Sequence, residues 1–176
     1  MAIIAPRGRI VLVPRIPEAL QEDFASYVTA PARLREAMAD LDPGALNRRP
    51  PGSDWSIRDI VIHVADSEIV RATRIFAVIA TDEPPIPSFD EDLYKRRLHY
   101  LWRDPELALS LFQHLRFALA EMLEQCDAAT WERAGIHEKD GSITLAELVR
   151  RGARHGEEHI AQVLEYRALV GDPARP

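Results

Sequence analysis

Two histidines four residues apart, His155 and His159, are the residues whose type and spacing most directly suggest chemistry. Positions i and i+4 of a helix lie one above the other on the same face, so both imidazoles can reach one metal ion beside the helix. The pair alone is a weak motif, because six histidines in 176 residues produce such spacings by chance. It also differs from the metalloprotease motif H-E-x-x-H, since Gly156 stands in place of the glutamate.

A third ligand has to come from another part of the chain, because a catalytic zinc-type site usually has three protein ligands and one open position. The remaining histidines are His63, His99, His114 and His137. His63 lies about 110° from the centre of its helix's apolar stripe, so periodicity alone does not select it. We expect His99 and His114 to be surface residues that bind no metal, because they lie off the apolar stripes.

Glu68 and Arg71 are charged residues within roughly 30° of the centre of an otherwise apolar helix stripe. Both are therefore candidates for lining a pocket, and Glu68 is the inward carboxylate that could act as a general base. An i,i+3 ion pair near a helix seam explains the two residues equally well. Tyr166, on the inner face predicted for the last helix, is a further candidate for lining the pocket.

Length and composition indicate one globular domain, with 47% hydrophobic and 28% charged residues. The net charge of −6 argues against binding to nucleic acid phosphates. Cys126 is the sole cysteine, which excludes an intrachain disulfide and suits a reducing cytoplasm. No apolar run approaches the roughly 20 residues of a membrane span, and prolines and arginines interrupt the first 17 residues where a signal peptide would be apolar.

The helical pattern predicts an all-α four-helix bundle over residues 18–176, preceded by an extended N-terminal arm over residues 1–17. The arm contains one β-like run at 9–13. A short helix is expected from Glu18, and the long helices at 29–41 (capped by Thr29), 56–80 (Ser56 with Asp59), 104–126 (Asp104) and 144–170 (Thr144 with Glu147).

The connections between these helices are expected to be loops, at 81–103 and 128–142. The first is long enough to cover a site, and residues 93–101 within it can be helical. The helix over 104–126 is expected to bury one apolar stripe, made of Leu107, Leu111, Leu115, Ala118, Leu119, Met122 and Cys126.

Two paired segments resemble the signatures of the DinB-like superfamily, which includes the YfiT-type predicted hydrolases. The first is W-S-I-R-D at 55–59 followed by H-V-A-D-S-E at 63–68, and the second is G-S-I-T-L at 141–145 followed by His155, His159 and Gln162. The resemblance spans residues 29–170. It implies a four-helix bundle, commonly dimeric, that holds a divalent metal, usually zinc or nickel. Carried onto matching positions, it makes His63, His155 and His159 the ligand set.

The resemblance implies two activities on a small-molecule substrate. One is metal-dependent hydrolysis, and the other is transfer or isomerisation with a low-molecular-weight thiol as cofactor. In both, a cation held by three neutral imidazoles lowers the pKa of the nucleophile. The competing class is a non-catalytic metalloprotein, or a small-molecule-binding or stress-response protein, whose metal is structural. A structural site is normally closed by four protein ligands, which separates the two classes.

Overall fold

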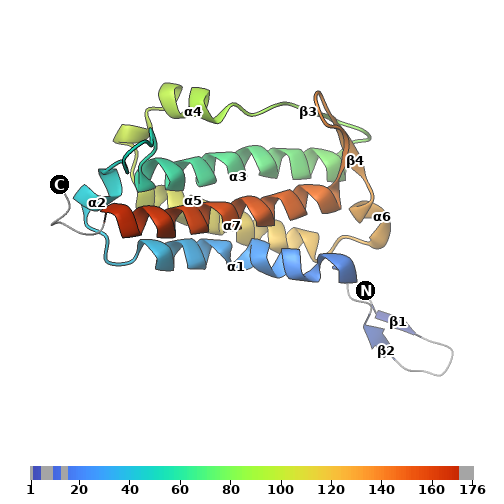
Figure 1. Ribbon diagram of the computed structural model, residues 1–176. Helices are drawn as coiled ribbons and strands as arrows, with labels where there is room; N and C mark the ends of the chain where they lie inside the picture. Colours follow the sequence, from blue (N-terminus) through green and yellow to red (C-terminus); the bar gives the residue numbers. More distant parts are fainter. Residues whose placement is uncertain (1, 5–9, 13–15, 171–176) are drawn as a thin grey trace.

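Four long helices run side by side in the computed structural model, which describes residues 2–4, 10–12 and 16–170 (Figure 1). They are α1 (Gln21–Met38), α3 (Ile57–Ala80), α5 (Pro105–Leu123) and α7 (Leu145–Val170). The buried residues are mainly aliphatic side chains that these helices turn toward one another. The predicted all-α four-helix bundle is confirmed.

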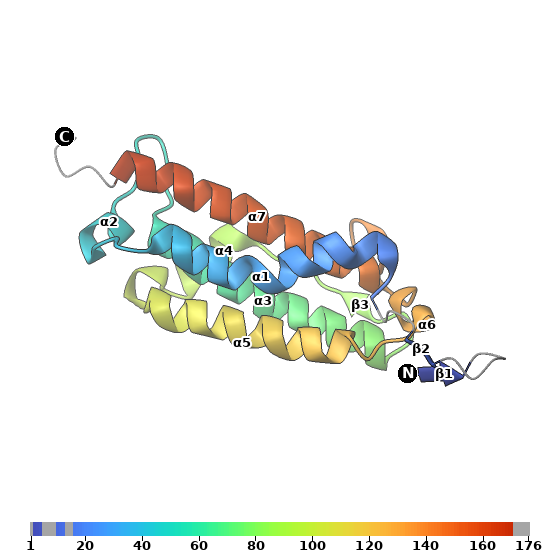
Figure 2. The same cartoon turned by 90° about the horizontal axis from the view of Figure 1, so that it is seen from below.

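The direction of the helices explains the long connection after α3. Around the bundle the order is α1, α7, α3 and α5, and α3 runs parallel to α5 while α1 runs parallel to α7 (Figures 1 and 2). A helix of 24 residues such as α3 is about 36 Å long, so the chain has to return along its whole length before α5 begins. This return is residues 81–103, which we call the crossover segment.

The crossover segment has regular structure along its length. It contains β3 (Pro85–Ile86), helix α4 (Glu91–Arg97) and a 3₁₀ turn, η2 (Tyr100–Trp102). Asp90 caps α4 by accepting a hydrogen bond from the Leu93 backbone N–H at 2.8 Å. The expectation of helix within residues 93–101 is therefore partly met, because α4 begins two residues earlier and ends at Arg97.

The caps predicted for the long helices are largely present. Ser56 and Asp59 form a complete capping box at the start of α3, and Asp104 caps α5 with Pro105 in the first turn. Thr144 Oγ1 accepts a hydrogen bond from the Glu147 backbone N–H at 3.1 Å. The Glu147 carboxylate binds Arg150 and Arg151. Of the capping box predicted for Thr144 and Glu147, the structure therefore shows the hydrogen bond of the threonine side chain but not that of the glutamate side chain.

The predicted start of the first long helix is wrong. Residues 18–38 form one continuous element, the turn η1 (Glu18–Leu20) followed by α1, and Pro31 lies inside the helix. Proline has no backbone N–H, so the carbonyl of Tyr27 loses its partner four residues later in the helix. Arg116 of α5 replaces that partner, since its Nη1 donates to the Tyr27 carbonyl oxygen at 2.6 Å. The missing bond is therefore supplied by another helix.

The buried stripe predicted for α5 is wrong at three of its seven positions, which are exposed. Leu107 is 71% exposed and Leu111 is 39% exposed, while Leu119 and Cys126 are buried as expected. Ala118 is exposed, and Leu115 and Met122 are half-buried. The residues that do face the core are Pro105, Ala108, Leu109, Phe112, Arg116, Leu119, Ala120 and Leu123. A helix that is apolar on most sides has no unique stripe, and the buried side of α5 also holds the polar side chain of Arg116.

Strands occur where the sequence analysis expected none. Residues 128–142 contain helix α6 (Ala128–Trp131) and strand β4 (Ala134–His137), which pairs antiparallel with β5 (Gly141–Thr144). Strand β3 pairs parallel with β4, with Ile86 opposite His137. Gly141 has a φ of 73°, which the turn between β4 and β5 requires and which L side chains rarely adopt.

Two further elements complete the described chain. In the N-terminal arm, β1 (Ala2–Ile4) pairs antiparallel with β2 (Ile10–Leu12), and β2 lies within the predicted run at 9–13, whose ends fall outside the described residues. A short helix, α2 (Pro43–Asn47), joins α1 to the α3 capping region, and Asp42 is its N-cap residue. None of the helices in the described residues has the length and hydropathy needed to cross a membrane.

Candidate metal centre

The structure brings three histidines from two helices together. His63 lies on α3, and His155 and His159 lie one turn apart on α7. The Nε2 atom of His155 is 3.2 Å from the Nε2 atom of His63 and 3.2 Å from that of His159. One donor nitrogen from each ring lies within 4.8 Å of the other two. We call these three residues the histidine triad.

Two glycines on α7 allow the close helix packing that positions the triad. A Cβ atom at Gly156 would lie 3.1 Å from the Cβ atom of Ala30 on α1. A Cβ atom at Gly152 would lie 2.8 Å from both the Cδ atom of Arg71 and the ring of Tyr27. Because such distances are tighter than ordinary van der Waals contact, glycine lets α7 approach α1 and α3. Each of these glycines lies three residues from a triad histidine in sequence.

Burial keeps the triad imidazoles neutral. Burial, followed by the neighbouring His159 and Arg71, lowers the pKa of His63 to about 3. Burial is also the first cause that lowers the pKa of His155, and it lowers the pKa of His159 as well. A neutral imidazole offers a nitrogen lone pair, which is the form that binds metal ions.

A chain of hydrogen bonds orients His159 through its Nδ1 atom, on the side of the ring away from the other two histidines. Its Nδ1 lies 2.8 Å from Oε1 of Gln162, whose amide nitrogen donates to the Tyr166 hydroxyl at 3.3 Å. The Tyr166 hydroxyl is in turn 2.7 Å from Oγ of Ser53. This arrangement places the ring hydrogen of His159 on Nδ1 and leaves the lone pair on Nε2. Tyr166, expected as a pocket-lining residue, is half-buried and supports the triad through Gln162.

The donor chemistry of the triad fits a divalent cation. With the hydrogen of His159 on Nδ1, its Nε2 can only accept, and the Nε2 of His155 can donate at most one hydrogen. Three nitrogens at these distances therefore cannot all be satisfied by one another. A cation that accepts all three lone pairs resolves this, and imidazole nitrogens are common ligands of zinc, nickel and similar ions.

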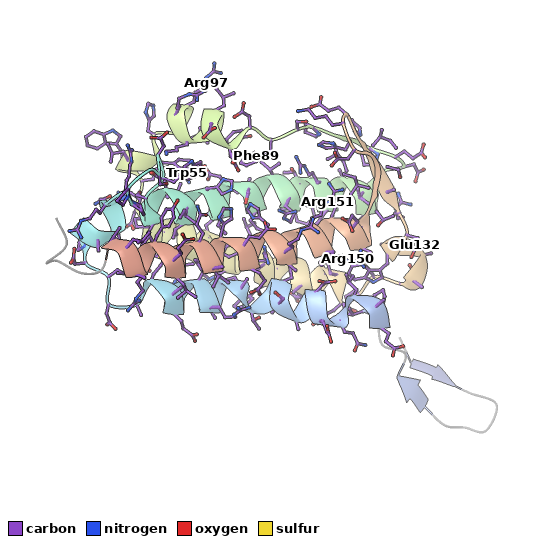
Figure 3. The ribbon with its side chains drawn as sticks, in the orientation of Figure 1. Trp55, Phe89, Arg97, Glu132, Arg150 and Arg151 are labelled. Atoms are coloured by element: carbon purple, nitrogen blue, oxygen red, sulfur yellow. The ribbon has the colours of Figure 1, made fainter. Side chains whose placement is uncertain are left out.

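Aromatic rings cover the His63 side of the triad. The Trp55 ring meets the His63 ring edge-on with 5.4 Å between centroids, and Phe89 stacks on His63 at 5.7 Å with an interplanar angle of 30°. Phe89 belongs to the crossover segment and lies between that segment and α3 (Figure 3). These rings limit the access of water to His63, whose side chain is 1% exposed.

Glu68 and Arg71 are both buried, and they lie in a larger ionic cluster. Glu68 Oε2 is 3.6 Å from Nε of Arg71 and 3.0 Å from Nη2 of Arg116. Tyr27 donates its hydroxyl to Oε1 of Glu68. Arg116 is 0% exposed and also donates to the Gly152 carbonyl oxygen at 2.9 Å. The sequence pattern indicated the pair of Glu68 and Arg71, whereas Arg116 and Tyr27 join the cluster from other helices and carry no such signal.

Glu91 is a site residue that the sequence analysis did not single out. Its Oε2 atom lies 3.6 Å from Nε2 of His63, and its charge raises the pKa of His159 against the larger effect of burial. Glu91 belongs to the acidic run Asp90, Glu91 and Asp92 in the crossover segment. A long connection with an acidic run was a usable signal, but nothing in the sequence shows which carboxylate faces the histidines.

The other histidines lie away from the triad. His99 and His114 are exposed, as predicted, and Nδ1 of His114 is 2.6 Å from the Ser110 carbonyl oxygen in its own helix. His137 is at the end of β4, where its Nδ1 accepts hydrogen bonds from the backbone N–H groups of Lys139 and Asp140. Of the histidines in the described residues, His63 is therefore the one that lies beside the pair on α7.

Sequence comparisons relate the chain to one family. The model of the DinB superfamily matches residues 26–163. A Bacillus licheniformis protein named "Putative metal-dependent hydrolase" is 29% identical over 153 residues, which are 86% of this chain and 87% of that protein. The Bacillus subtilis protein YfiT, which bears the same name, is 25% identical over 142 residues, 80% of each chain.

Structural comparisons agree with the bundle described above. The structure of YfiT from Bacillus subtilis, described as a probable metal-dependent hydrolase with an unusual four-helix bundle topology, matches with a TM-score of 0.81 and 22% identity over 96% of this chain and 97% of that one. A mycothiol-dependent maleylpyruvate isomerase matches with a TM-score of 0.67 and 13% identity over 93% of this chain and 65% of that one. At these identities the likeness shows a shared fold.

Proposed function

The chain belongs to the DinB superfamily, and from this premise we propose that it is a metal-dependent enzyme acting on a small molecule. The observation that carries the proposal is the convergence of the three Nε2 atoms of the histidine triad. We propose that His63, His155 and His159 hold one divalent ion, with zinc and nickel the first candidates. Three histidine ligands leave a coordination position that a substrate can take, either open or held by a donor that the substrate displaces, whereas a closed structural site offers none.

The protein residues around the triad prepare the site for a nucleophilic reaction. When bound there, a divalent ion supplies Lewis acidity, which lowers the pKa of a coordinated water or thiol toward neutral. Gln162 holds the ring of His159 in the required tautomer through its 2.8 Å contact. Trp55 and Phe89 restrict water around His63, which strengthens electrostatic interactions in the site.

Two reaction classes fit this arrangement. The names of the sequence relatives favour hydrolysis, with water as the nucleophile. The fold shared with the mycothiol-dependent isomerase supports a low-molecular-weight thiol as the nucleophile. The chain's sole cysteine, Cys126, is buried, and burial raises the pKa of its thiol, so a thiol reaction needs an external thiol.

Glu68 was considered either as a general base or as part of a structural ion pair, and its contacts support the structural role. Its carboxylate is bound by Tyr27, Arg71 and Arg116, none of which belongs to the triad. We therefore propose that Glu68 stabilises the fold and is not the general base. Arg71 stays a proposed pocket residue, because its charge is close enough to lower the pKa of His63 and His155.

Metal analysis followed by two activity screens tests the proposed function. We expect the purified chain to contain about one equivalent of a divalent metal, measured by elemental analysis. The metal-loaded protein is then assayed with activated esters and amides without thiol, and with a low-molecular-weight thiol plus an electrophilic acceptor. Turnover in the first screen identifies a hydrolase, and thiol consumption in the second identifies a transferase. If the chain holds one equivalent of metal but shows no turnover in either screen, the class of proteins with a structural metal would be favoured.

We further propose that two copies of the chain associate through the outer side of α3 and α5, which pack against each other. Ile69 and Phe76 on α3 are 41% and 49% exposed, and Leu107 and Leu111 on α5 are 71% and 39% exposed. The α5 residues belong to the stripe whose spacing is typical of a buried helix face. A second copy offering the same surface would cover it, as expected for a family that is commonly dimeric.

Replacing both Leu107 and Leu111 with lysine should therefore convert a dimer to a monomer. The apolar contact would be lost and charges would be introduced at the centre of the interface. Light scattering coupled to size exclusion should give twice 19.9 kDa for the wild type and 19.9 kDa for the double variant. Leu164→Lys, at a 52% exposed position on α7, is the control and should remain dimeric. A monomeric wild type at micromolar concentration would contradict the proposal.

A further inference from the structure

The crossover segment places a carboxylate next to the histidine triad. The segment has to cover the length of α3, so one of its residues necessarily passes the level of His63. The residue found there is Glu91, the first residue of α4. Its Oε2 atom is 3.6 Å from Nε2 of His63, the same atom that faces the Nε2 of His155.

The distance between Glu91 and His63 suits two ligands of one ion. Two donor atoms that each lie about 2.0 to 2.2 Å from an ion, at tetrahedral angles, are about 3.3 to 3.6 Å apart. Two of the nitrogen pairs within the triad are separated by 3.2 Å, and the carboxylate oxygen lies 3.6 Å from Nε2 of His63, so Glu91 meets this spacing to one of the three histidines. A direct hydrogen bond is a poorer description, because 3.6 Å is longer than the usual 2.7 to 3.2 Å range.

Contacts on both sides of Glu91 hold it at this position. Two residues earlier, Phe89 stacks on the ring of His63. Four residues later, Lys95 lies 4.5 Å above the Trp55 ring, 3.6 Å from the Asp59 carboxylate, and donates to the Asp54 carbonyl oxygen. Because the backbone is anchored before and after Glu91, its carboxylate does not reach the triad by chance orientation of a free loop.

We propose that Glu91 supplies a fourth, oxygen donor to the divalent ion held by the histidine triad. This inference rests on the proposed metal centre and adds a ligand from an element outside the helix pair that carries the histidines. Helix α4 has no buried residues, and the Glu91 side chain is 59% exposed. A substrate or thiol can therefore displace the carboxylate without opening the bundle core, which keeps a fourth protein donor compatible with catalysis.

Cobalt loading of the full chain tests this assignment. Co²⁺ is added to metal-free protein, its affinity is measured by competition with a chelator, and its visible absorption bands report the number and type of ligands. For Glu91→Gln we expect affinity to fall about 10- to 100-fold, the range typical of groups that support a metal site, together with a changed cobalt spectrum. Asp92→Asn removes the same charge at the next residue, and we expect both readouts to stay at wild-type values.

Three results would overturn the proposal in distinguishable ways. Unchanged affinity and spectrum in Glu91→Gln would show that the carboxylate is not a ligand. An equal loss of affinity in Asp92→Asn would show that the effect is only the general charge of the acidic run. A wild-type chain that binds no cobalt would overturn the metal centre itself, and Glu91 as its ligand with it. Far-ultraviolet circular dichroism of each variant checks that the exposed substitution leaves the bundle folded.

Discussion

Replacing His155 with alanine should abolish stoichiometric metal binding. His155 is the central member of the triad, since its Nε2 lies 3.2 Å from the Nε2 atoms of both His63 and His159. Without His155, only the nitrogens of His63 and His159 remain to bind the ion. We therefore expect the affinity for the metal to fall on the order of 100-fold or more. Elemental analysis after desalting should then find far less than one equivalent of metal.

Thermal unfolding with and without added metal gives a second readout for His155→Ala. A ligand at 100 times its dissociation constant stabilises the folded state by about 2.7 kcal/mol. For a chain of this length that corresponds to a rise in Tm of roughly 5 to 10 °C, which the wild type should show and the variant should lack. His99→Ala and His114→Ala, at exposed positions, are the controls and should keep metal content and the shift. Full metal retention in His155→Ala would refute the assigned centre.

Replacing Glu68 with glutamine should strongly destabilise the fold. The change leaves Arg116, at 0% exposure, and Arg71, at 8% exposure, without the carboxylate that lies between them. Breaking a buried ion pair by removing one partner typically costs 3 to 5 kcal/mol, because the remaining charge is buried and uncompensated. We expect Tm to fall by roughly 6 to 20 °C, measured by calorimetry or circular dichroism.

The same variant separates the two roles considered for Glu68. If the carboxylate is structural, Glu68→Gln should still bind one equivalent of metal and keep its turnover at temperatures where it is folded. Glu121→Gln, an exposed position on α5, is the matched control and should change the free energy of unfolding by less than about 0.5 kcal/mol. Normal stability combined with lost turnover in Glu68→Gln would instead restore the general-base role.

The cluster around Glu68 also explains a proline within α1. Pro31 leaves the Tyr27 carbonyl without its helical donor, and Arg116 takes over that bond. Arg116 must therefore be buried, and Glu68 balances its charge at 3.0 Å. From the sequence, Pro31 indicated a helix start, because local rules treat the unpaired backbone carbonyl that a proline leaves inside a helix as a cost to be avoided. Only in the folded bundle does the Arg116 guanidinium reach the Tyr27 carbonyl, and only there does Glu68 balance the guanidinium charge.

The sequence by itself determined the parts of this protein that depend on local physics. The capping box of Ser56 and Asp59 and the cap of Asp104 marked helix starts from neighbouring residues, and the i,i+4 spacing of His155 and His159 placed both on one face. The family resemblance added His63, and the structure brings its ring to the other two. These features need no knowledge of how the helices pack.

Tertiary structure alone decided the features that depend on helix direction and on contacts between distant residues. The parallel course of α3 and α5 makes the crossover segment long and carries Glu91 to the triad, and no residue pattern encodes that direction. The apolar residues of α5 occupy several faces, so only packing shows that Leu107 is exposed and Leu109 buried. Hydrophobic periodicity measures the width of an apolar face, whereas the partner helices decide which part of that face is covered.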